Sequence, residues 1–90
     1  MFRFTYAAKL TADRKDGGYV VTFRDLPEAI TQGDAIAEAL SEAEGALQAA
    51  IDGRIEDNLD IPAPSAPKRG ERPVATPVTT ALKAAVYLAL

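Results

Sequence analysis

The sequence predicts a small α+β domain: an antiparallel β-sheet with one long helix packed on one face, plus a C-terminal helix. Two segments of alternating apolar and polar residues flank a glycine-containing turn, which is typical of a β-hairpin. A later segment has apolar residues at steps of three and four, as in an amphipathic helix. A chain of 90 residues can bury one core of this kind. The expected order is strand, strand, strand, helix, and the sequence leaves room for a fourth short strand.

The first two strands are expected to pair as a hairpin. Phe2–Ala12 alternates strictly, and one face of this strand carries the apolar side chains Phe2, Phe4, Tyr6, Ala8 and Leu10. Tyr19–Arg24 alternates again, with aromatic and β-branched side chains that can pack across from the first strand. Between them, Asp13–Gly18 contains Gly17 and Gly18, which permit the positive φ angles of a tight reversal.

A third strand and a long helix follow. Pro27 ends the second strand because it lacks an amide donor. The third strand is predicted at Ala29–Gln32. Asp34 is the predicted N-cap of a helix over Ala35–Asp57. No capping box is expected, because Ala37 stands where Glu or Gln would be needed.

The long helix is expected to bury one apolar stripe and to expose an acidic face. The stripe contains Ile36, Leu40, Ala43, Leu47, Ala50, Ile51 and Ile55. The opposite face carries Glu38, Glu42, Asp52 and Glu56. After the helix, Asn58 is predicted to adopt the left-handed conformation that often follows a helix end.

Composition divides the chain into three regions. Residues 1–60 are expected to form the α+β domain, residues 61–73 a proline-rich linker, and residues 74–90 a C-terminal strand and helix. The linker holds four of the six prolines, a composition that excludes a helix or an interior strand.

The C-terminal region is predicted to contain a short edge strand at Val74–Val78 and a helix at Ala81–Leu90, capped by Thr79 or Thr80. This helix is apolar on nearly all sides, and such a helix requires burial. We therefore expect it to pack against another subunit, in a dimer or tetramer, or against residues that follow Leu90. It would then be the start of an oligomerisation or DNA-binding region.

The composition excludes several kinds of chemistry. The chain has no cysteine and no histidine, which removes disulfides, thiol and imidazole catalysis and metal sites built on soft ligands. Asp13 and Asp16 stand beside Gly17, but the further ligands of a calcium loop do not follow. We expect no catalytic residue, no metal, no cofactor and no enzymatic activity.

Charge is distributed unevenly along the chain. Residues 1–60 hold twelve acidic and six basic side chains, whereas residues 61–90 hold one acidic and four basic side chains. An acidic body repels phosphate backbones and favours a basic partner, although the same charges also serve solubility. The apolar end of the chain is far shorter than the ~20 residues that cross a bilayer. No membrane contact and a cytoplasmic location are expected.

The segment Gly17–Leu40 (GGYVVTFRDLPEAITQGDAIAEAL) resembles the N-terminal domain of the HicB family of antitoxins, and the resemblance covers about residues 4–65. The matching positions are Gly17, Gly18, Tyr19, Val21, Phe23, Asp25, Leu26, Pro27, Ile30, Thr31, Gly33, Asp34 and Ala39. Structural roles are expected for Gly17, Gly18, Tyr19, Phe23, Leu26, Pro27, Gly33 and Asp34. Arg24 and Glu28 stand where the family usually has Pro and Gly.

The resemblance implies a partial ribonuclease-H-like fold and the neutralisation of a small basic HicA-type toxin, which cleaves mRNA with a histidine. The first strand contains no Asp or Glu, so the metal-binding carboxylates of an active ribonuclease H are not expected. Many family members also carry a C-terminal helix-turn-helix or ribbon-helix-helix domain that binds operator DNA. DNA binding is therefore expected only through residues beyond this chain.

Four carboxylates are the expected toxin contacts: Asp25, Glu28, Glu38 and Glu42. Each could instead be a solvated charge, and Asp25 could cap a turn. One alternative function is a DNA-binding autorepressor that uses Lys68, Arg69 and Arg72, which would give only salt-sensitive attraction. The other is an orphan homo-oligomeric scaffold of the same fold without a toxin partner.

Overall fold

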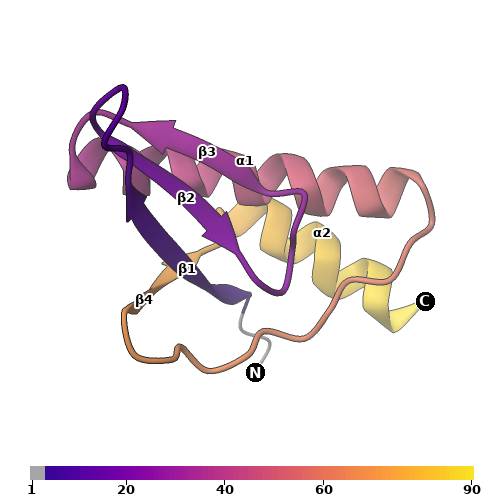
Figure 1. The fold of residues 1–90 in the computed structure, drawn as a ribbon. Coiled ribbons are helices and arrows are strands. Elements are labelled where there is room, and N and C mark those ends of the chain that lie inside the picture. Colours follow the sequence, from indigo (N-terminus) through magenta and orange to yellow (C-terminus); the bar gives the residue numbers. More distant parts are fainter. Residues whose placement is uncertain (1–3) are drawn as a thin grey trace.

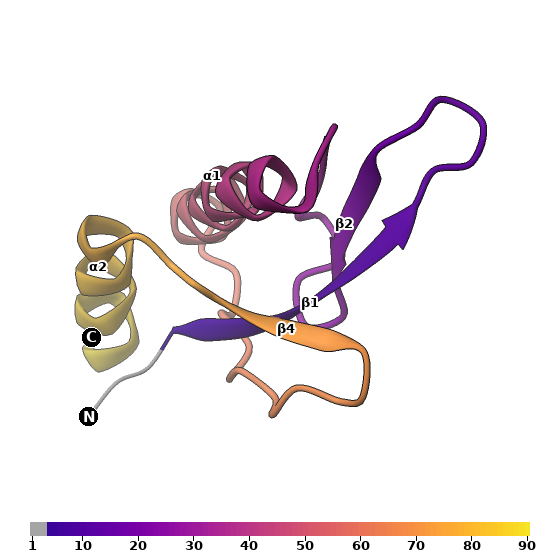
Figure 2. The same cartoon turned by 90° about the vertical axis from the view of Figure 1, so that its left-hand side faces the viewer.

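Four strands form one antiparallel sheet, and both helices lie on the same side of it (Figures 1 and 2). The computed structural model describes residues 4–90. The elements are β1 (Thr5–Ala12), β2 (Tyr19–Phe23), β3 (Ile30–Gly33), α1 (Ile36–Glu56), β4 (Glu71–Ala75) and α2 (Val78–Ala89). The strand order is β3-β2-β1-β4, which makes β3 and β4 the two edges. The predicted α+β class is confirmed, and the fourth strand is present.

β1 and β2 form the predicted hairpin. The Asp13 amide donates to the Gly18 carbonyl over 2.9 Å and closes the turn. Gly17 and Gly18 have φ angles of +78° and +77°, which other residues rarely adopt. Gly18 is also constrained by contact, because an added Cβ would lie 2.6 Å from the Gly33 carbonyl oxygen. Phe2 of the predicted first strand lies outside the described residues.

The sheet face toward α1 carries the core. Phe4 before β1, Tyr6 and Ala8 in β1, and Val21 and Phe23 in β2 are all buried. Their alternation with more exposed residues confirms the predicted period of two, apart from the buried Ala7. The largest fully buried side chains are Tyr6, Phe23, Leu26, Leu47, Ile51, Val21 and Thr80.

β3 leads directly into a close contact with α1. The strand begins at Ile30, one residue later than expected, because the Ala29 amide donates to the Leu26 carbonyl in the preceding turn. A Cβ on Gly33 would lie 2.5 Å from the Ala39 nitrogen, so only glycine allows the helix to approach this strand. The small Ala39 is itself fully buried at that contact.

The start of α1 differs from the prediction. The N-cap is Ala35 rather than Asp34, and no side chain caps it. Because the helix begins one residue later, Glu38 occupies its third position, from which a glutamate can reach back. The Glu38 carboxylate accepts a hydrogen bond of 3.2 Å from the Asp34 amide. Because Asp34 precedes the N-cap Ala35, this bond is not that of a capping box.

The apolar stripe of α1 is confirmed in its centre and differs at its N-terminal end. The buried residues of the helix are Ala39, Ala43, Leu47, Ala50 and Ile51. Ile36, predicted to be part of the stripe, has 37% of its surface exposed. At the other end, Asn58 has a φ of +57°, which confirms the predicted left-handed residue after the helix.

The chain between α1 and β4 runs back along the sheet and is fixed by contacts. Ile61 is buried, and the Pro62 carbonyl accepts a hydrogen bond of 2.8 Å from the Tyr6 hydroxyl. β4 begins at Glu71, three residues before the predicted Val74, and includes Pro73. Proline is tolerated there because β4 is an edge strand, where an amide is not needed on the outer side.

α2 packs beside α1 (Figure 2). It begins at Val78 with Pro77 as its N-cap, so the prediction that Thr79 or Thr80 caps it is wrong. Ala84 is fully buried against the core. Among residues 4–90, no helix is long and apolar enough to cross a membrane.

Candidate protein-interaction surface

One stretch of the chain carries acidic side chains and no basic ones, and Arg54 and Lys83 from outside it pair with Glu28 and Asp52. Between Arg24 and Arg54 the sequence contains no Lys or Arg. It contains seven acidic residues there: Asp25, Glu28, Asp34, Glu38, Glu42, Glu44 and Asp52. This stretch builds β3 and nearly all of α1, and we call the surface formed by these seven residues the acidic surface.

Glu38 and Glu42 lie on the first half of α1, one turn apart on the same side of the helix. Both side chains are exposed. Glu38 accepts a hydrogen bond from the Asp34 amide, whereas Glu42 has no hydrogen bond or ion pair within the described part of the chain. Of the four predicted contacts, Glu42 is therefore the one whose carboxylate is not engaged by another described residue.

Asp25 and Glu28 have internal partners. Both Asp25 oxygens accept hydrogen bonds of 2.8 Å from Ser65, one from its amide and one from its hydroxyl. Glu28 forms an ion pair with Arg54. The hydrogen bond from the Arg54 guanidinium lowers the pKa of the Glu28 carboxyl below its usual value. The same guanidinium donates to the Asp60 carbonyl over 2.8 Å, which ties the end of α1 to the chain beyond it.

The structure does not bring the four predicted contact residues together. Arg54, the partner of Glu28, lies sixteen positions after Glu38 in α1, and a rise of 1.5 Å per residue separates the two helix positions by about 24 Å. Glu38 and Glu42 therefore belong to one end of the acidic surface, and Asp25 and Glu28 to the other.

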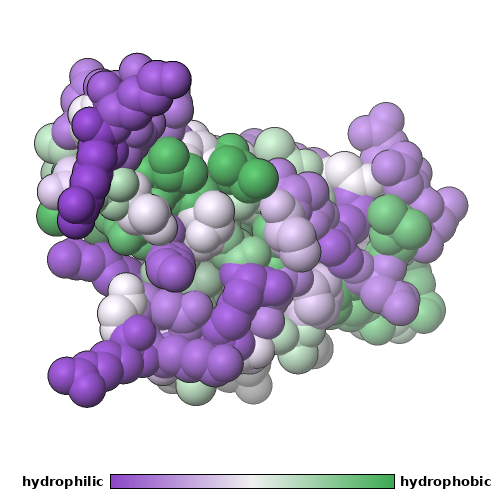
Figure 3. Space-filling model, viewed as in Figure 1, coloured by the Kyte–Doolittle hydropathy of each residue, from purple (hydrophilic) through white to green (hydrophobic). Residues whose placement is uncertain are grey.

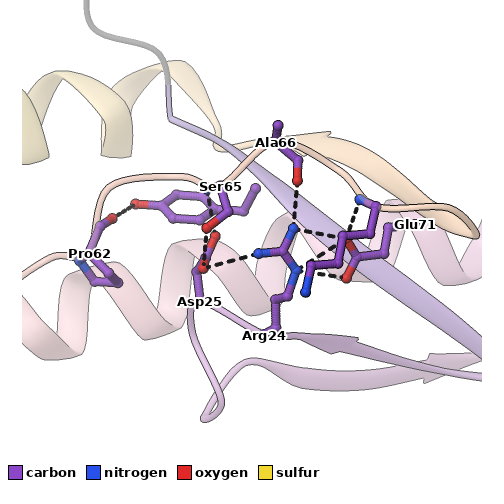
Figure 4. A network of polar contacts seen from close by, with 8 residues as sticks. Arg24, Asp25, Pro62, Ser65, Ala66 and Glu71 are labelled. Carbon is purple, nitrogen blue, oxygen red and sulfur yellow. Dashed lines mark hydrogen bonds and ion pairs between the residues drawn. The ribbon is translucent and has the colours of Figure 1, made fainter.

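A polar network joins the end of β2 to β4 (Figure 4). The Arg24 guanidinium donates to both Glu71 oxygens, over 3.0 Å and 3.1 Å, and to the Ala66 carbonyl. The hydrogen bond from Arg24 and a second one from the Lys68 amide lower the pKa of the Glu71 carboxyl below its usual value. This network holds the proline-rich return segment against the sheet.

Sequence reasoning missed these ion pairs, although one signal pointed to them. Arg24 and Glu28 flank the DLP motif and are the two departures noted with the resemblance above. Both departures are charged, and each forms an ion pair, with Glu71 and with Arg54. The partner lies 47 positions away for Arg24 and 26 for Glu28, beyond the reach of local patterns.

Tyr6 is a core residue with a polar end. Its side chain is fully buried, and its hydroxyl donates to the Pro62 carbonyl. Burial, followed by the negative charge of Asp25, raises the pKa of Tyr6 to about 12. The hydroxyl is thus held as a neutral donor.

A shallow cavity of about 230 Å³ lies between the hairpin turn and the start of α1. Its lining includes the acidic residues Asp13, Asp16, Asp34 and Glu38. Within residues 4–90, no group of three or more side chains is arranged to hold a metal ion. The cavity extends the acidic surface toward the hairpin.

Comparison with known proteins identifies the class of this chain. A family model described as the HicB-like antitoxin of bacterial toxin-antitoxin systems matches residues 5–85, which include β4 and most of α2. Antitoxin HicB of Escherichia coli strain K12 is 44% identical over 68 residues, which are 76% of this chain and 49% of that protein. Antitoxin HicB 2 of Photorhabdus laumondii subsp. laumondii is 42% identical over 78 residues, which are 87% of this chain and 53% of that protein.

The class is thus that of bacterial antitoxins. The chain belongs to the HicB-like antitoxin family, which confirms the resemblance of Gly17–Leu40. It spans about half the length of the curated relatives it matches.

Proposed function

We propose that this chain binds a small basic mRNA-cleaving toxin of the HicA type and neutralises it by covering the surface with which the toxin binds RNA. The observation that carries this proposal is the acidic surface, in which no basic side chain interrupts the sequence from Asp25 to Gly53. A protein that binds RNA presents positive charge. An acidic helix held rigidly on a sheet can occupy that charge in place of phosphates.

In this proposal the chain acts by occupancy, without catalysis, in the cytoplasm where mRNA is cleaved. Glu38 and Glu42 make the direct contacts, because both are exposed and stand on one side of α1. Asp25 and Glu28 add negative charge at the far end of the acidic surface while they hold internal partners. Opposite charges on the two proteins accelerate association and make it sensitive to salt.

The test reverses charge at the proposed contacts. The double variant Glu38→Lys, Glu42→Lys is expected to weaken binding of an inactive HicA-type toxin, its histidine replaced by alanine, by more than about tenfold in calorimetry. The matched control, Glu56→Lys with Asp57→Lys, makes the same change in net charge at the other end of α1 and is expected to weaken binding by less than about threefold.

Because Glu38 also accepts a hydrogen bond from the backbone, the single variant Glu42→Lys separates contact from folding. It is expected to keep the wild-type melting temperature and still lose affinity. Equal affinities for the double variant, its control and the wild type would remove this helix face as the contact surface.

We also propose that α2 joins two copies of the chain into a dimer, which can pair further into a tetramer. The supporting observation is a row of exposed apolar side chains at every fourth position of α2 and its end: Val78 at 75%, Leu82 at 63%, Val86 at 64% and Leu90 at 98% exposure. Rows with this spacing pack helix against helix. Three members of the row, Leu82, Val86 and Leu90, line an open hollow of about 490 Å³.

Light scattering at micromolar concentration tests the dimer. The wild type is expected to have at least the mass of a dimer, and Leu82→Glu the mass of a monomer with an unchanged circular dichroism spectrum. A monomeric wild type would leave the row to a different partner or to residues beyond Leu90 and would end the dimer proposal.

A further inference from the structure

The two edges of the sheet are built differently. β4, at one edge, contains Pro73 and the charged Glu71 and Arg72, features that natural proteins use to prevent another strand from pairing there. β3, at the other edge, has the sequence ITQG, with no proline and no charge. Pairing with an additional strand is therefore disfavoured at the β4 edge, and no such feature protects the β3 edge, which we call unguarded.

The outer backbone groups of β3 are unpaired. In an antiparallel pair, alternate residues direct their amide and carbonyl groups toward the neighbouring strand, and the residues between them direct theirs outward. β3 pairs only with β2, so one alternate set, Ile30 and Gln32 or Thr31 and Gly33, points away from the sheet. Within the described residues, no other backbone or side-chain group bonds to these outward groups.

Apolar surface accompanies this edge. The register pairs Thr31 with the buried Val21, so Ile30 and Gln32 lie on the sheet face opposite α1. Ile30 is 62% exposed there, and its diagonal neighbour Val20 is half-buried. Figure 3 shows hydrophobic side chains gathered over β2 and β3 on this face, bordered by hydrophilic ones. Side chains of a strand added to β3 would pack beside Ile30 on this face.

Charge selects the occupant. Asp34 directly follows β3 and lies beside Glu38, whereas Glu28, two residues before the strand, is paired with Arg54. Two copies paired through β3 would bring together two chains of formal net charge −3, which is unfavourable. A strand flanked by basic residues would instead meet complementary charge at Asp34 and Glu38.

We propose that β3 accepts a β-strand of the basic toxin, which extends the four-stranded sheet of the antitoxin across the interface. This inference rests on the proposed toxin-binding function and specifies its geometry. Main-chain hydrogen bonds to β3 give affinity that depends little on sequence, and the contacts at Ile30, Asp34 and Glu38 select the partner. The acidic face of α1 then contacts the toxin beside the shared sheet.

Residue-resolved amide exchange tests the proposal on the full chain, alone and with the inactive HicA-type toxin. Exchange of the outward alternate amides of β3 is expected to slow by at least about tenfold in the complex. The amides of β4 are expected to exchange at unchanged rates. Complex formation without slower exchange in β3 overturns the strand proposal and leaves the proposed function standing.

Two other outcomes also decide the matter. Absence of any complex means that the proposed function itself fails. Protection of β3 that rises with antitoxin concentration in the absence of toxin means that a second copy occupies the edge, which overturns the proposal.

Substitutions separate strand pairing from simple charge attraction. Ile30→Lys and Ile30→Asp change charge in opposite directions but remove the same apolar contact, so both are expected to weaken toxin binding about tenfold. Leu59 is 52% exposed outside β3, so Leu59→Lys and Leu59→Asp serve as matched controls and are expected to stay within about threefold. Tighter binding by Ile30→Asp would show that charge alone acts at this position and would count against the proposal.

Discussion

β3 and β4 are both edge strands of one sheet, yet they are held in place by different means. β3 follows β2 after a short loop and lies against the start of α1. β4 returns only after the whole of α1 and the proline-rich segment, and Arg24–Glu71 and Asp25–Ser65 contacts secure that return. The strand that arrives from far along the chain is held by side-chain contacts, and its proline and charged residues disfavour pairing with another strand. The local strand is held by β2 and by the start of α1, and its sequence contains neither proline nor a charged residue.

Matched substitutions at the two edges should give the largest difference in the free energy of unfolding. Val74 in β4 is 5% exposed and pairs with Tyr6 in the register, whereas Ile30 in β3 is 62% exposed. Val74→Asp buries an unpaired carboxylate and is expected to lower the free energy of unfolding by about 3 kcal/mol or more. Ile30→Asp is expected to lower it by less than about 1 kcal/mol.

Urea unfolding followed by circular dichroism measures both variants against the wild type. The chain contains no tryptophan, so backbone ellipticity is the convenient signal. Equal losses for the two variants would mean that β3 is as much a part of the folded core as β4, and the contrast between the edges would disappear.

Loss of the hydrogen bonds between Asp25 and Ser65, which hold the return segment, should have an intermediate effect on stability. Asp25→Asn keeps the shape of the side chain but removes a charged acceptor from Ser65, and it is expected to destabilise the protein by about 1–2 kcal/mol. Ser65→Ala removes only the hydroxyl bond and is expected to cost about half as much.

A double-mutant cycle with these two changes measures their coupling. Amide exchange at Ser65 should accelerate in Asp25→Asn, while exchange in β3 stays unchanged. Additive effects without coupling would show that Asp25 does not hold the segment through Ser65.

The contrast between local and distant contacts also marks how far the sequence could predict this molecule. The hairpin, the core of the α1 stripe and the left-handed Asn58 follow from patterns within a few residues, and the structure confirms them. The start of β4 and the Arg24–Glu71 pair depend on which distant segments meet. Composition alone cannot supply that information, because proline content indicates an extended segment without indicating where it lies.

The candidate surface shows the same division. The exposed positions of Glu38 and Glu42 follow from helix periodicity, which the sequence displays directly. The internal partners of Asp25 and Glu28 do not, since an exposed loop carboxylate and an anchoring one look alike in sequence. The unguarded character of β3 emerges only once the strand order makes it an edge.

The smallest expected effect concerns the ion pair on β4 and depends on pH. Hydrogen bonds from Arg24 and from the Lys68 amide hold the pKa of Glu71 below its ordinary value of 4.5. The folded state therefore favours the carboxylate, so the stability it contributes is present above that ordinary value and is lost as the pH falls through the lowered pKa. Glu71→Gln removes this contribution, and its unfolding midpoint in urea should decline less than that of the wild type between about pH 5 and about pH 3. Because the pair is at the surface, about 1 M NaCl should shrink the difference between the two proteins. If the urea midpoints of the two proteins fall in parallel with pH at low salt, the Arg24–Glu71 pair does not help to hold β4. Backbone pairing with β1 would then hold this edge alone.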